Sequence, residues 1–366
     1  MPNKSFDVLV LGAGIVGLAL GLKLQEQGRH VILVDRGEPG AATSFGNAGL
    51  IERSTVFPYA FPRDIKTLLA YAFGRRVAAN YHLRALPYLL PWMWRYWLHS
   101  SPKLYPKAIA GALPLIEHSW SEHQPLIEAA TAQQLVNEHG WIKVFRTEKS
   151  AQENHRMAVL SRTYGVNAID LTAPQLMAKE PALKSGLIGG VHYPDARQIQ
   201  DPQALSLAYL RLFESRGGKF VQGDALTLQV DASEWSVQTA LGRIKAPHAV
   251  IALGPWGEDL ARQLGISLPM GRKRGYHMHF QTATTTLIHT IVDVENGYAI
   301  APMKQGLRVT TGAEFALRDA PPTPVQLKRI EPVLRSLTHL GERMDTQPWL
   351  GSRPCTPDML PLIGAA

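Results

Sequence analysis

The chain contains 366 residues, which is long enough for about two joined domains because single domains commonly contain about 100 to 200 residues. Its hydrophobic fraction of 45% and charged fraction of 19% are typical of globular proteins and exclude a chain that is disordered throughout. The formal charge of +8 is compatible with acidic ligands, an anionic membrane surface or a plain solvated surface. Because Lys and Arg are spread along the chain, we expect no nucleic-acid partner.

The cysteine content and the hydropathy pattern restrict where the protein acts. Cys355 is the only cysteine, so no internal disulfide can form and a reducing compartment is favoured. No run reaches the roughly 18 unbroken apolar residues of a membrane-spanning helix. The apolar run Val8–Leu22 is divided by glycines and is not interpreted as a secretory signal. We therefore expect a cytoplasmic protein, with peripheral contact at the cytoplasmic membrane face as an open alternative.

Residues 7 to 35 have the order of a βαβ unit. Asp7–Leu11 is an apolar run typical of a strand, Leu18–Gln27 has helical apolar spacing, and His30–Asp35 is a second strand-like run. A glycine-rich turn, GAGIVG, separates the first strand from the helix. Because the whole context is present, the pattern predicts a dinucleotide site rather than a glycine turn without a ligand.

Each residue of this motif has a chemical reason. Gly12 allows the tight turn, Gly14 lets the backbone approach a pyrophosphate, and Gly17 lets the helix pack closely on the strand. The free N–H groups at the helix start face the phosphates. Asp35 follows Gly17 by 18 residues, which suits hydrogen bonds from the ribose hydroxyls and argues against a 2′-phosphate.

The segment Gly40–Ile51 discriminates between two dinucleotides. NAD and FAD both fit the βαβ unit, but an NAD-dependent dehydrogenase usually continues with further simple βα units. This segment is instead rich in small and hydroxyl side chains, which permit close approach of the backbone to a ligand. The pattern favours FAD and leaves a plain surface loop as the alternative.

Later segments predict a second part with a different architecture. Residues 85–140 are expected to be largely helical, and Leu86–Leu98 is either an aromatic-rich helix in a membrane interface or a helix packed under the domain. Asp201 and Pro202 begin a helix that ends near residue 216. Alternating or apolar runs predict strands at 141–146, 219–222, 226–230, 234–239, 242–245, 249–253, 276–280 and 307–311.

His277 and His279 alternate on a predicted strand and therefore share one face, as two metal ligands could. No third ligand lies at a suggestive spacing. We therefore expect no metal and interpret the pair as filling the sheet face near the site.

The glycine unit, Asp35-Arg36, the stretch Thr43–Gly49 and Gly351-Ser352-Arg353-Pro354 together resemble the D-amino-acid dehydrogenase small-subunit family. That family belongs to the group of D-amino-acid oxidase, glycine oxidase and sarcosine oxidase, and the resemblance covers essentially the whole chain. It implies an α/β fold in which an FAD-binding Rossmann-like domain is interleaved with an α+β substrate domain that contains a mixed antiparallel sheet. We expect residues 1–84, 191–264 and 346–366 in the FAD-binding domain, and 85–190 and 265–345 in the substrate domain.

The motif and the resemblance together give a set of expected FAD-binding residues. The resemblance implies that the Thr43–Gly49 stretch lines the pyrophosphate, ribityl chain and isoalloxazine, and that Arg36 lies near the adenosine. The full set is Gly12, Gly14, Ile15, Val16, Gly17, Asp35, Arg36, Thr43, Ser44, Asn47, Ala48, Gly49, Gly254, Trp256 and Gly351.

The same resemblance implies two catalytic residues. Arg353 matches the position at which glycine oxidase and D-amino-acid oxidase hold the substrate carboxylate, and a planar guanidinium suits that bidentate task. Tyr298 matches an assisting tyrosine, with a core aromatic as the open alternative. The expected reaction is oxidative deamination of a D-amino acid by hydride transfer to FAD, which gives a 2-oxo acid and ammonia.

Several alternatives stay open from the sequence. The substrate could be glycine, sarcosine or another secondary amino acid, and the electron acceptor could be oxygen, a quinone or a second subunit. A non-catalytic flavin-binding subunit is a hypothesis of a different class, and an NAD-dependent dehydrogenase is disfavoured by Thr43–Gly49. Relatives continue beyond the position of Ala366 with a strand, a glycine-rich loop and a helix, so we expect a shortened sequence.

Overall fold

The computed structural model describes residues 5–72, 77–231, 233–283 and 285–365, and the chain divides into two compact units. Unit 1 consists of Met1–Gly46, His123–Leu135 and Asp201–Leu268, and unit 2 consists of Asn47–Glu122, Val136–Gln200 and Pro269–Ala366. The expected domain ranges differ from these units in several segments. The ranges 47–84, 191–200 and 346–366 were expected in the FAD-binding domain but belong to unit 2, whereas 123–135 and 265–268 were expected in the substrate domain but belong to unit 1. The functional assignment of these segments stays a prediction.

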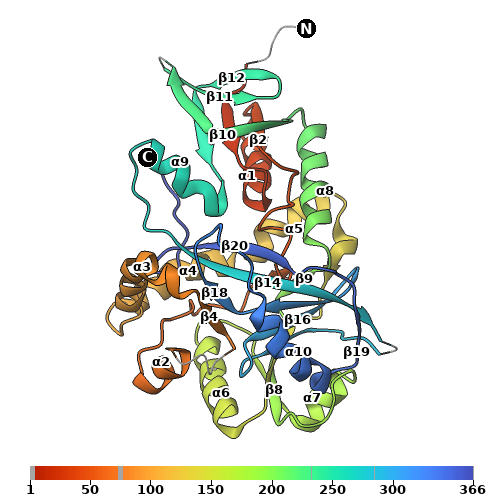
Figure 1. Ribbon diagram of the computed structural model, residues 1–366. Helices are drawn as coiled ribbons and strands as arrows, with labels where there is room; N and C mark the ends of the chain where they lie inside the picture. Colours follow the sequence, from red (N-terminus) through yellow and green to blue (C-terminus); the bar gives the residue numbers. More distant parts are fainter. Residues whose placement is uncertain (1–4, 73–76, 232, 284, 366) are drawn as a thin grey trace. The chain divides into compact units, whose positions relative to one another are not determined.

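Unit 1 is built on a six-stranded sheet with the strand order β12-β11-β10-β2-β1-β13 (Figure 1). Four neighbouring strands, β10, β2, β1 and β13, are parallel, and a β11–β12 hairpin extends the sheet in antiparallel pairing. The strands of the unit are β1 (Val8–Leu11), β2 (Val31–Asp35), β10 (Lys219–Asp231), β11 (Glu234–Thr239), β12 (Gly242–Ala246) and β13 (His248–Ile251). The helices are α1 (Ile15–Glu26), η2 (Gln133–Leu135), α8 (Pro202–Ser215), η3 (Gly254–Trp256) and α9 (Gly257–Gln263).

The predicted βαβ unit is confirmed as β1, α1 and β2. Both strands are apolar because they are central and covered on both faces, and Leu9 and Ile32 are fully buried. The predicted helix start at Asp201 is also confirmed, since its side chain accepts a hydrogen bond from the Ala204 N–H at 3.0 Å. Two predicted short strands are instead one long strand, β10, which is irregular between Asp224 and Gln229.

Unit 2 contains an 11-stranded mixed sheet that is organised around the long strand β14 (Gly271–Thr282). The path runs β4-β18-β14-β17-β16-β15-β6-β8-β7, and β19 and β20 also pair with β14. The remaining strands are β4 (Ala79–Tyr81), β6 (Trp141–Phe145), β7 (Ile169–Thr172), β8 (Gly189–Tyr193), β15 (Thr290–Asp293), β16 (Tyr298–Met303), β17 (Gly306–Thr311), β18 (Ala313–Phe315), β19 (Leu340–Arg343) and β20 (Trp349–Cys355). A three-stranded sheet joins β3 (Leu50–Ile51), β9 (Arg197–Ile199) and β5 (Val136–Asn137). The mixed antiparallel sheet expected for the second part is therefore confirmed.

Helices of unit 2 come largely from the first half of the chain, as predicted for residues 85–140. They are α2 (Ile65–Ala72), η1 (Leu83–Ala85), α3 (Leu86–His99), α4 (Tyr105–Glu117), α6 (Glu148–Arg162), α7 (Ala173–Lys179) and α10 (Val325–Leu337), while α5 (Ser119–Ala129) continues from unit 2 into unit 1. Among the described residues, no helix combines the length and the apolar character needed to cross a membrane.

The two faces of the large sheet differ in chemistry because side chains alternate along each strand. One face belongs to an apolar core that includes Met278, Phe280, Leu307 and Val309, together with residues of α7 and α10. The opposite face of the same strands presents polar side chains, among them His277, His279, Arg308 and Thr310. We call this second side the polar face.

Candidate functional site

Two glycines of the glycine-rich turn in unit 1, Gly12 and Gly17, have no space for a Cβ atom. A Cβ atom at Gly12 would lie 2.4 Å from the Ala252 carbonyl oxygen, and the residue has a φ of +109°. A Cβ at Gly17 would lie 1.9 Å from the Gly12 carbonyl oxygen, so α1 can pack on the turn only through a glycine. Both roles predicted from the spacing are therefore present.

The N-terminus of α1 is open toward a ligand. Gly14 is the N-cap and has no side chain to bond the first-turn N–H groups. Ser44 supplies one acceptor from a distant segment, since its Oγ accepts from the Ile15 N–H at 3.0 Å. Val16, the next residue, is 68% exposed, so the first turn is not covered within unit 1. Free N–H groups at a helix start are suited to bind a pyrophosphate.

Asp35, at the end of β2, binds the glycine-rich turn through its carboxylate. Its Oδ2 accepts from the Ala13 N–H at 2.8 Å and its Oδ1 accepts from the Gly37 N–H at 3.0 Å. A carboxylate has about four acceptor positions, so each oxygen can still accept from a ribose hydroxyl. Asp35 therefore both fixes the turn and remains able to fill its predicted role.

Three further predicted residues meet in unit 1. The Arg36 guanidinium lies over the Trp256 ring, with 4.7 Å from Cζ to the ring centroid. Gly254 has a φ of +54°, and a Cβ there would have no atom within 4 Å. The glycine turn, the open helix start and Asp35 are the features by which a βαβ unit binds an adenosine diphosphate, so the residues of unit 1 fit the nucleotide half of FAD. Unit 1 holds Gly12, Gly14, Ile15, Val16, Gly17, Asp35, Arg36, Thr43, Ser44, Gly254 and Trp256 of the expected set.

The rest of the expected set belongs to unit 2. Asn47 accepts from the Gly49 N–H through its side-chain oxygen at 2.6 Å, which closes a tight turn around Ala48. Gly49 has a φ of +77°, and a Cβ there would lie 2.1 Å from the Ile199 carbonyl oxygen. The Ile199 N–H in turn donates to the Gly49 carbonyl at 2.7 Å. The turn is thus pinned to β9, and any side chain at Gly49 would displace it.

Arg353 lies on β20, where its position is fixed by pairing with β14. The register places Arg353 opposite Lys273 and Gly351 opposite Gly275, so all four residues lie on the polar face. The Arg353 Nη2 donates to the Thr311 carbonyl at 3.2 Å, and it occupies the space that a Gly275 Cβ would need, 2.4 Å away. Among the described residues no carboxylate pairs with Arg353, and the residue is exposed. The guanidinium can therefore receive a carboxylate from a ligand.

Tyr298 lies elsewhere. Its side chain is 3% exposed and belongs to the apolar core with Ile300 and Val309, on the face of the sheet opposite to the polar face. It neighbours the ion pair of Arg146 with the buried Asp293, and burial together with Asp293 raises the pKa of its hydroxyl. The structure therefore brings Gly351 and Arg353 together but does not bring Tyr298 to them.

The polar face continues from His277 to residues that the sequence did not indicate, among them Lys143 and Thr310. The register connects His277, Thr310, Ala299, Val292 and Lys143 in one row across five strands. His277 stacks on Trp349 with 4.8 Å between ring centroids, and the Trp349 ring also covers Gly351. Burial lowers the pKa of Lys143, while Glu52 raises it. Alternation of the predicted strands could have indicated this row, but only strand pairing shows which strands contribute to it.

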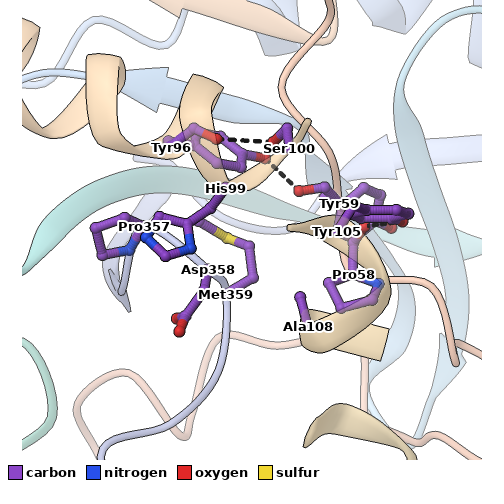
Figure 2. A pocket seen from close by; sticks show the side chains of 10 residues that line it. All are labelled: Pro58, Tyr59, Tyr96, His99, Ser100, Tyr105, Ala108, Pro357, Asp358 and Met359. Carbon is purple, nitrogen blue, oxygen red and sulfur yellow. Dashed lines mark hydrogen bonds between the residues drawn. The ribbon is translucent and has the colours of Figure 1, made fainter. Parts of the chain in front are cut away.

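The segment 57–61 presents Tyr59 on the surface of unit 2. Figure 2 shows that the Tyr96 hydroxyl donates to the Tyr59 carbonyl, while Ser100 bonds the carbonyl of Tyr96. The Tyr105 hydroxyl donates to the Pro58 carbonyl at 2.6 Å. These bonds fix the backbone of the segment, while the Tyr59 side chain is exposed. Tyr59 was not predicted from the sequence.

The two histidines of the polar face lie close to each other. His277 and His279 do share one face, as predicted, with 4.9 Å between ring centroids. Within the described part of the chain, no group of three or more His, Cys, Asp or Glu residues is arranged to hold a metal ion.

Comparisons with known proteins agree with this geometry. A family model described as FAD dependent oxidoreductase matches residues 7–366. A D-amino-acid oxidase of Bradyrhizobium diazoefficiens is 29% identical over 98% of this chain and 87% of its own length, and a D-amino acid dehydrogenase of Vibrio cholerae has the same identity and coverage. Among solved structures, glycine oxidase from Geobacillus kaustophilus has a TM-score of 0.72 at 21% identity, covering 99% of this chain and 86% of that one. L-proline dehydrogenase from P. horikoshii has a TM-score of 0.65 at 18% identity, covering 100% and 86%.

Replacement of Gly17 by alanine tests the glycine turn. Because the new Cβ would lie 1.9 Å from the Gly12 carbonyl oxygen, α1 must move away from β1 in Gly17→Ala. We expect a free energy of unfolding lowered by about 1 to 3 kcal/mol and a much lower FAD content. Urea denaturation and the ratio of flavin to protein absorbance measure both effects. Gly257→Ala is the control because its Cβ meets only an ordinary contact at 3.8 Å; full FAD content in Gly17→Ala would contradict the assignment.

Proposed function

Because the chain belongs to the family of FAD-dependent oxidoreductases, we propose that it oxidises a D-amino acid at the Cα–N bond. The products are a 2-oxo acid and ammonia. The observation that carries this proposal is the Arg353 guanidinium, which lies on the polar face next to Gly275 without a carboxylate partner among the described residues.

Arg353 supplies the binding geometry that this reaction needs. A planar guanidinium forms two parallel hydrogen bonds to a carboxylate, so it fixes both the position and the rotation of an α-amino acid. Lys273 opposite Arg353 adds a second positive charge in the same region of the sheet. The two cations together favour an anionic group over a neutral one.

Orientation is the main task of the protein in such a reaction. When bound, FAD supplies the acceptor for the hydride that leaves the substrate Cα. The glycine turn, Ser44 and Asp35 would hold the nucleotide half of FAD. We propose that the Asn47–Gly49 turn contacts the flavin. Arg353 holds the carboxylate, so that the substrate presents its Cα–H in one direction. The amine is neutral when it reacts, and water then hydrolyses the imino acid to the 2-oxo acid and ammonia.

A D-amino acid is the favoured substrate because the two curated relatives described above carry the names D-amino-acid oxidase and D-amino acid dehydrogenase. Glycine, sarcosine and other secondary amino acids have the same carboxylate and could use the same guanidinium. A non-catalytic flavin-binding subunit is the second candidate. It would bind FAD through unit 1 but would show no reduction of the flavin by any amino acid.

Helix α3 offers a surface for peripheral membrane contact. Leu89, Trp92 and Tyr96 are buried on one side of the helix. Leu90, Trp94 and Leu98 follow each other at intervals of four residues and therefore form an exposed apolar stripe on another side. Exposed basic residues, Arg84, Arg95 and Lys103, lie nearby in the sequence. This combination is typical of interfacial helices, and we propose contact with an anionic lipid surface, where a quinone could accept the electrons.

The substrate class is tested by anaerobic absorbance spectra with D-amino acids, L-amino acids, glycine and sarcosine. We expect D-amino acids to bleach the flavin bands because the relatives named for D-amino acids cover nearly the whole chain. If glycine or sarcosine bleached the flavin bands faster than D-amino acids, the proposed substrate class would be wrong, and glycine or a secondary amino acid would take its place. A bound flavin that no candidate reduces would favour the non-catalytic subunit.

Substitution of Arg353 tests the carboxylate site. Arg353→Lys keeps the charge but loses the planar fork, and Arg353→Ala loses both. We expect KM for the amino acid to rise at least roughly 10- to 100-fold in the alanine variant and less in the lysine variant, with FAD still bound. Steady-state kinetics and the flavin spectrum measure these effects, and Arg335→Ala, which removes an exposed arginine of α10, is the control. Unchanged kinetics in Arg353→Ala would exclude this role.

The α3 surface is tested by co-sedimentation with vesicles of anionic phospholipid. We expect the double variant Trp94→Ser and Leu98→Ser to bind these vesicles about tenfold more weakly, because it loses exposed apolar area while the buried side of α3 is intact. The matched control is Val159→Ser with Leu160→Ser, which changes two exposed apolar residues of α6. Equal binding of the two double variants, or no binding by the parent protein, would contradict membrane contact through α3.

A further inference from the structure

A chain of hydrogen bonds crosses the polar face of unit 2. It begins at Asp345, in the connection between β19 and β20, whose Oδ2 accepts from both the backbone N–H of His279 at 2.6 Å and its Nδ1 at 2.9 Å. The His279 Nε2 accepts from the Arg308 Nε at 3.0 Å. The Arg308 Nη1 then donates to the Asn47 carbonyl oxygen at 2.9 Å.

The direction of each bond follows from the chemistry of the donors. An arginine Nε can only donate, so the His279 Nε2 must accept and carries no proton. The proton of the neutral imidazole is then on Nδ1, where it is donated to Asp345. The carboxylate therefore fixes both the tautomer and the rotation of the ring, and the ring fixes the guanidinium of Arg308.

Arg308 cannot be replaced by a point charge in this arrangement. Its side chain is 3% exposed and uses two different nitrogens, Nε toward His279 and Nη1 toward Asn47. The two N–H donors lie in the plane of the guanidinium, and its covalent geometry fixes their directions. A lysine ammonium has the same charge but cannot hold both partners in the same directions.

The end of the chain of bonds is the turn that the proposed function assigns to the flavin. Asn47 binds the Gly49 N–H through its side chain, and Gly49 is pinned to Ile199 of β9. The bond from Arg308 adds an anchor at the Asn47 carbonyl, from a strand 261 residues away in the sequence. Two separate strands, β9 and β17, thus determine the position of Asn47–Gly49.

We propose that Asp345, His279 and Arg308 are positioning residues that set Asn47–Gly49 against the flavin and thereby control the rate at which the substrate reduces it. This inference rests on the proposed contact of Asn47–Gly49 with the flavin. The three residues act through the turn and are not themselves in contact with the reacting atoms. We call this chain of hydrogen bonds from Asp345 through His279 and Arg308 the relay. Loss of the relay displaces the Asn47–Gly49 turn without removing any residue of the nucleotide site in unit 1.

The experiment uses holoenzyme variants at two positions. Asp345→Ala removes both acceptor bonds, whereas Asp345→Asn keeps one oxygen that can occupy the place of Oδ2. Arg308→Lys keeps the charge and loses the fork. We expect Asp345→Ala and Arg308→Lys to reduce the flavin about tenfold more slowly at saturating amino acid, with a shifted flavin spectrum and a nearly unchanged KM, because small misplacements cost orientation. Asp345→Asn should remain close to the parent.

Two further variants make the outcomes separable. Arg335→Ala is the control for removal of an arginine from unit 2 and should behave as the parent. Asn47→Ala tests the assignment of the turn itself through the FAD dissociation constant and the spectrum of the bound flavin. Asn47→Ala could change the FAD dissociation constant and the flavin spectrum while Asp345→Ala and Arg308→Lys keep the spectrum and the reduction rate of the parent. In that case the relay has no positioning role, and the assignment of Asn47–Gly49 to the flavin stands. If Asn47→Ala leaves the flavin unchanged, the assignment of the turn is wrong, and the relay inference fails with it.

Discussion

The approach of α1 to the turn after β1 is the constraint on which the nucleotide site depends. The missing Cβ of Gly17 would lie 1.9 Å from the Gly12 carbonyl oxygen, so helix and turn are in direct backbone contact. This contact brings the open end of the helix to the end of β1, where Ser44 and Asp35 bind the adjacent N–H groups. A larger residue at Gly17 would separate the helix start from the strand end, and the phosphates would then lose the donors that both elements supply.

Alternation along the strands of unit 2 provides the second constraint. The core side is apolar, whereas the polar face buries His277, His279 and Arg308, whose side chains are costly to remove from water without partners. Hydrogen bonds with Asp345 and Asn47 satisfy much of this requirement. The face therefore combines polar groups that are held by hydrogen bonds with two glycines, Gly275 and Gly351, which leave space for the Arg353 guanidinium and the Trp349 ring.

The sequence predicts the local parts of this structure better than the distant ones. The βαβ unit and the start of α8 follow from short patterns of glycines, caps and apolar spacing, and the structure confirms them. The side of the sheet on which Tyr298 lies could not be predicted, because period-two alternation gives two faces but does not say which one meets the core. The bond between Arg308 and Asn47 joins residues 261 positions apart and has no local signal at all.

The arrangement of Lys273 and Arg353 explains how two like charges can lie side by side on neighbouring strands. Such a pair is unfavourable unless each charge has its own partner. Lys273 Nζ is directed to α3, where it donates to the Tyr96 hydroxyl at 3.2 Å and lies 4.3 Å from the centroid of that ring. Burial lowers the pKa of Lys273, and the charge of Arg353 also lowers it. The lysine ammonium thus has its partners on α3, whereas Arg353 is still repelled by the charge of Lys273. An anion that binds at Arg353 reduces this repulsion, which favours a carboxylate over a neutral ligand.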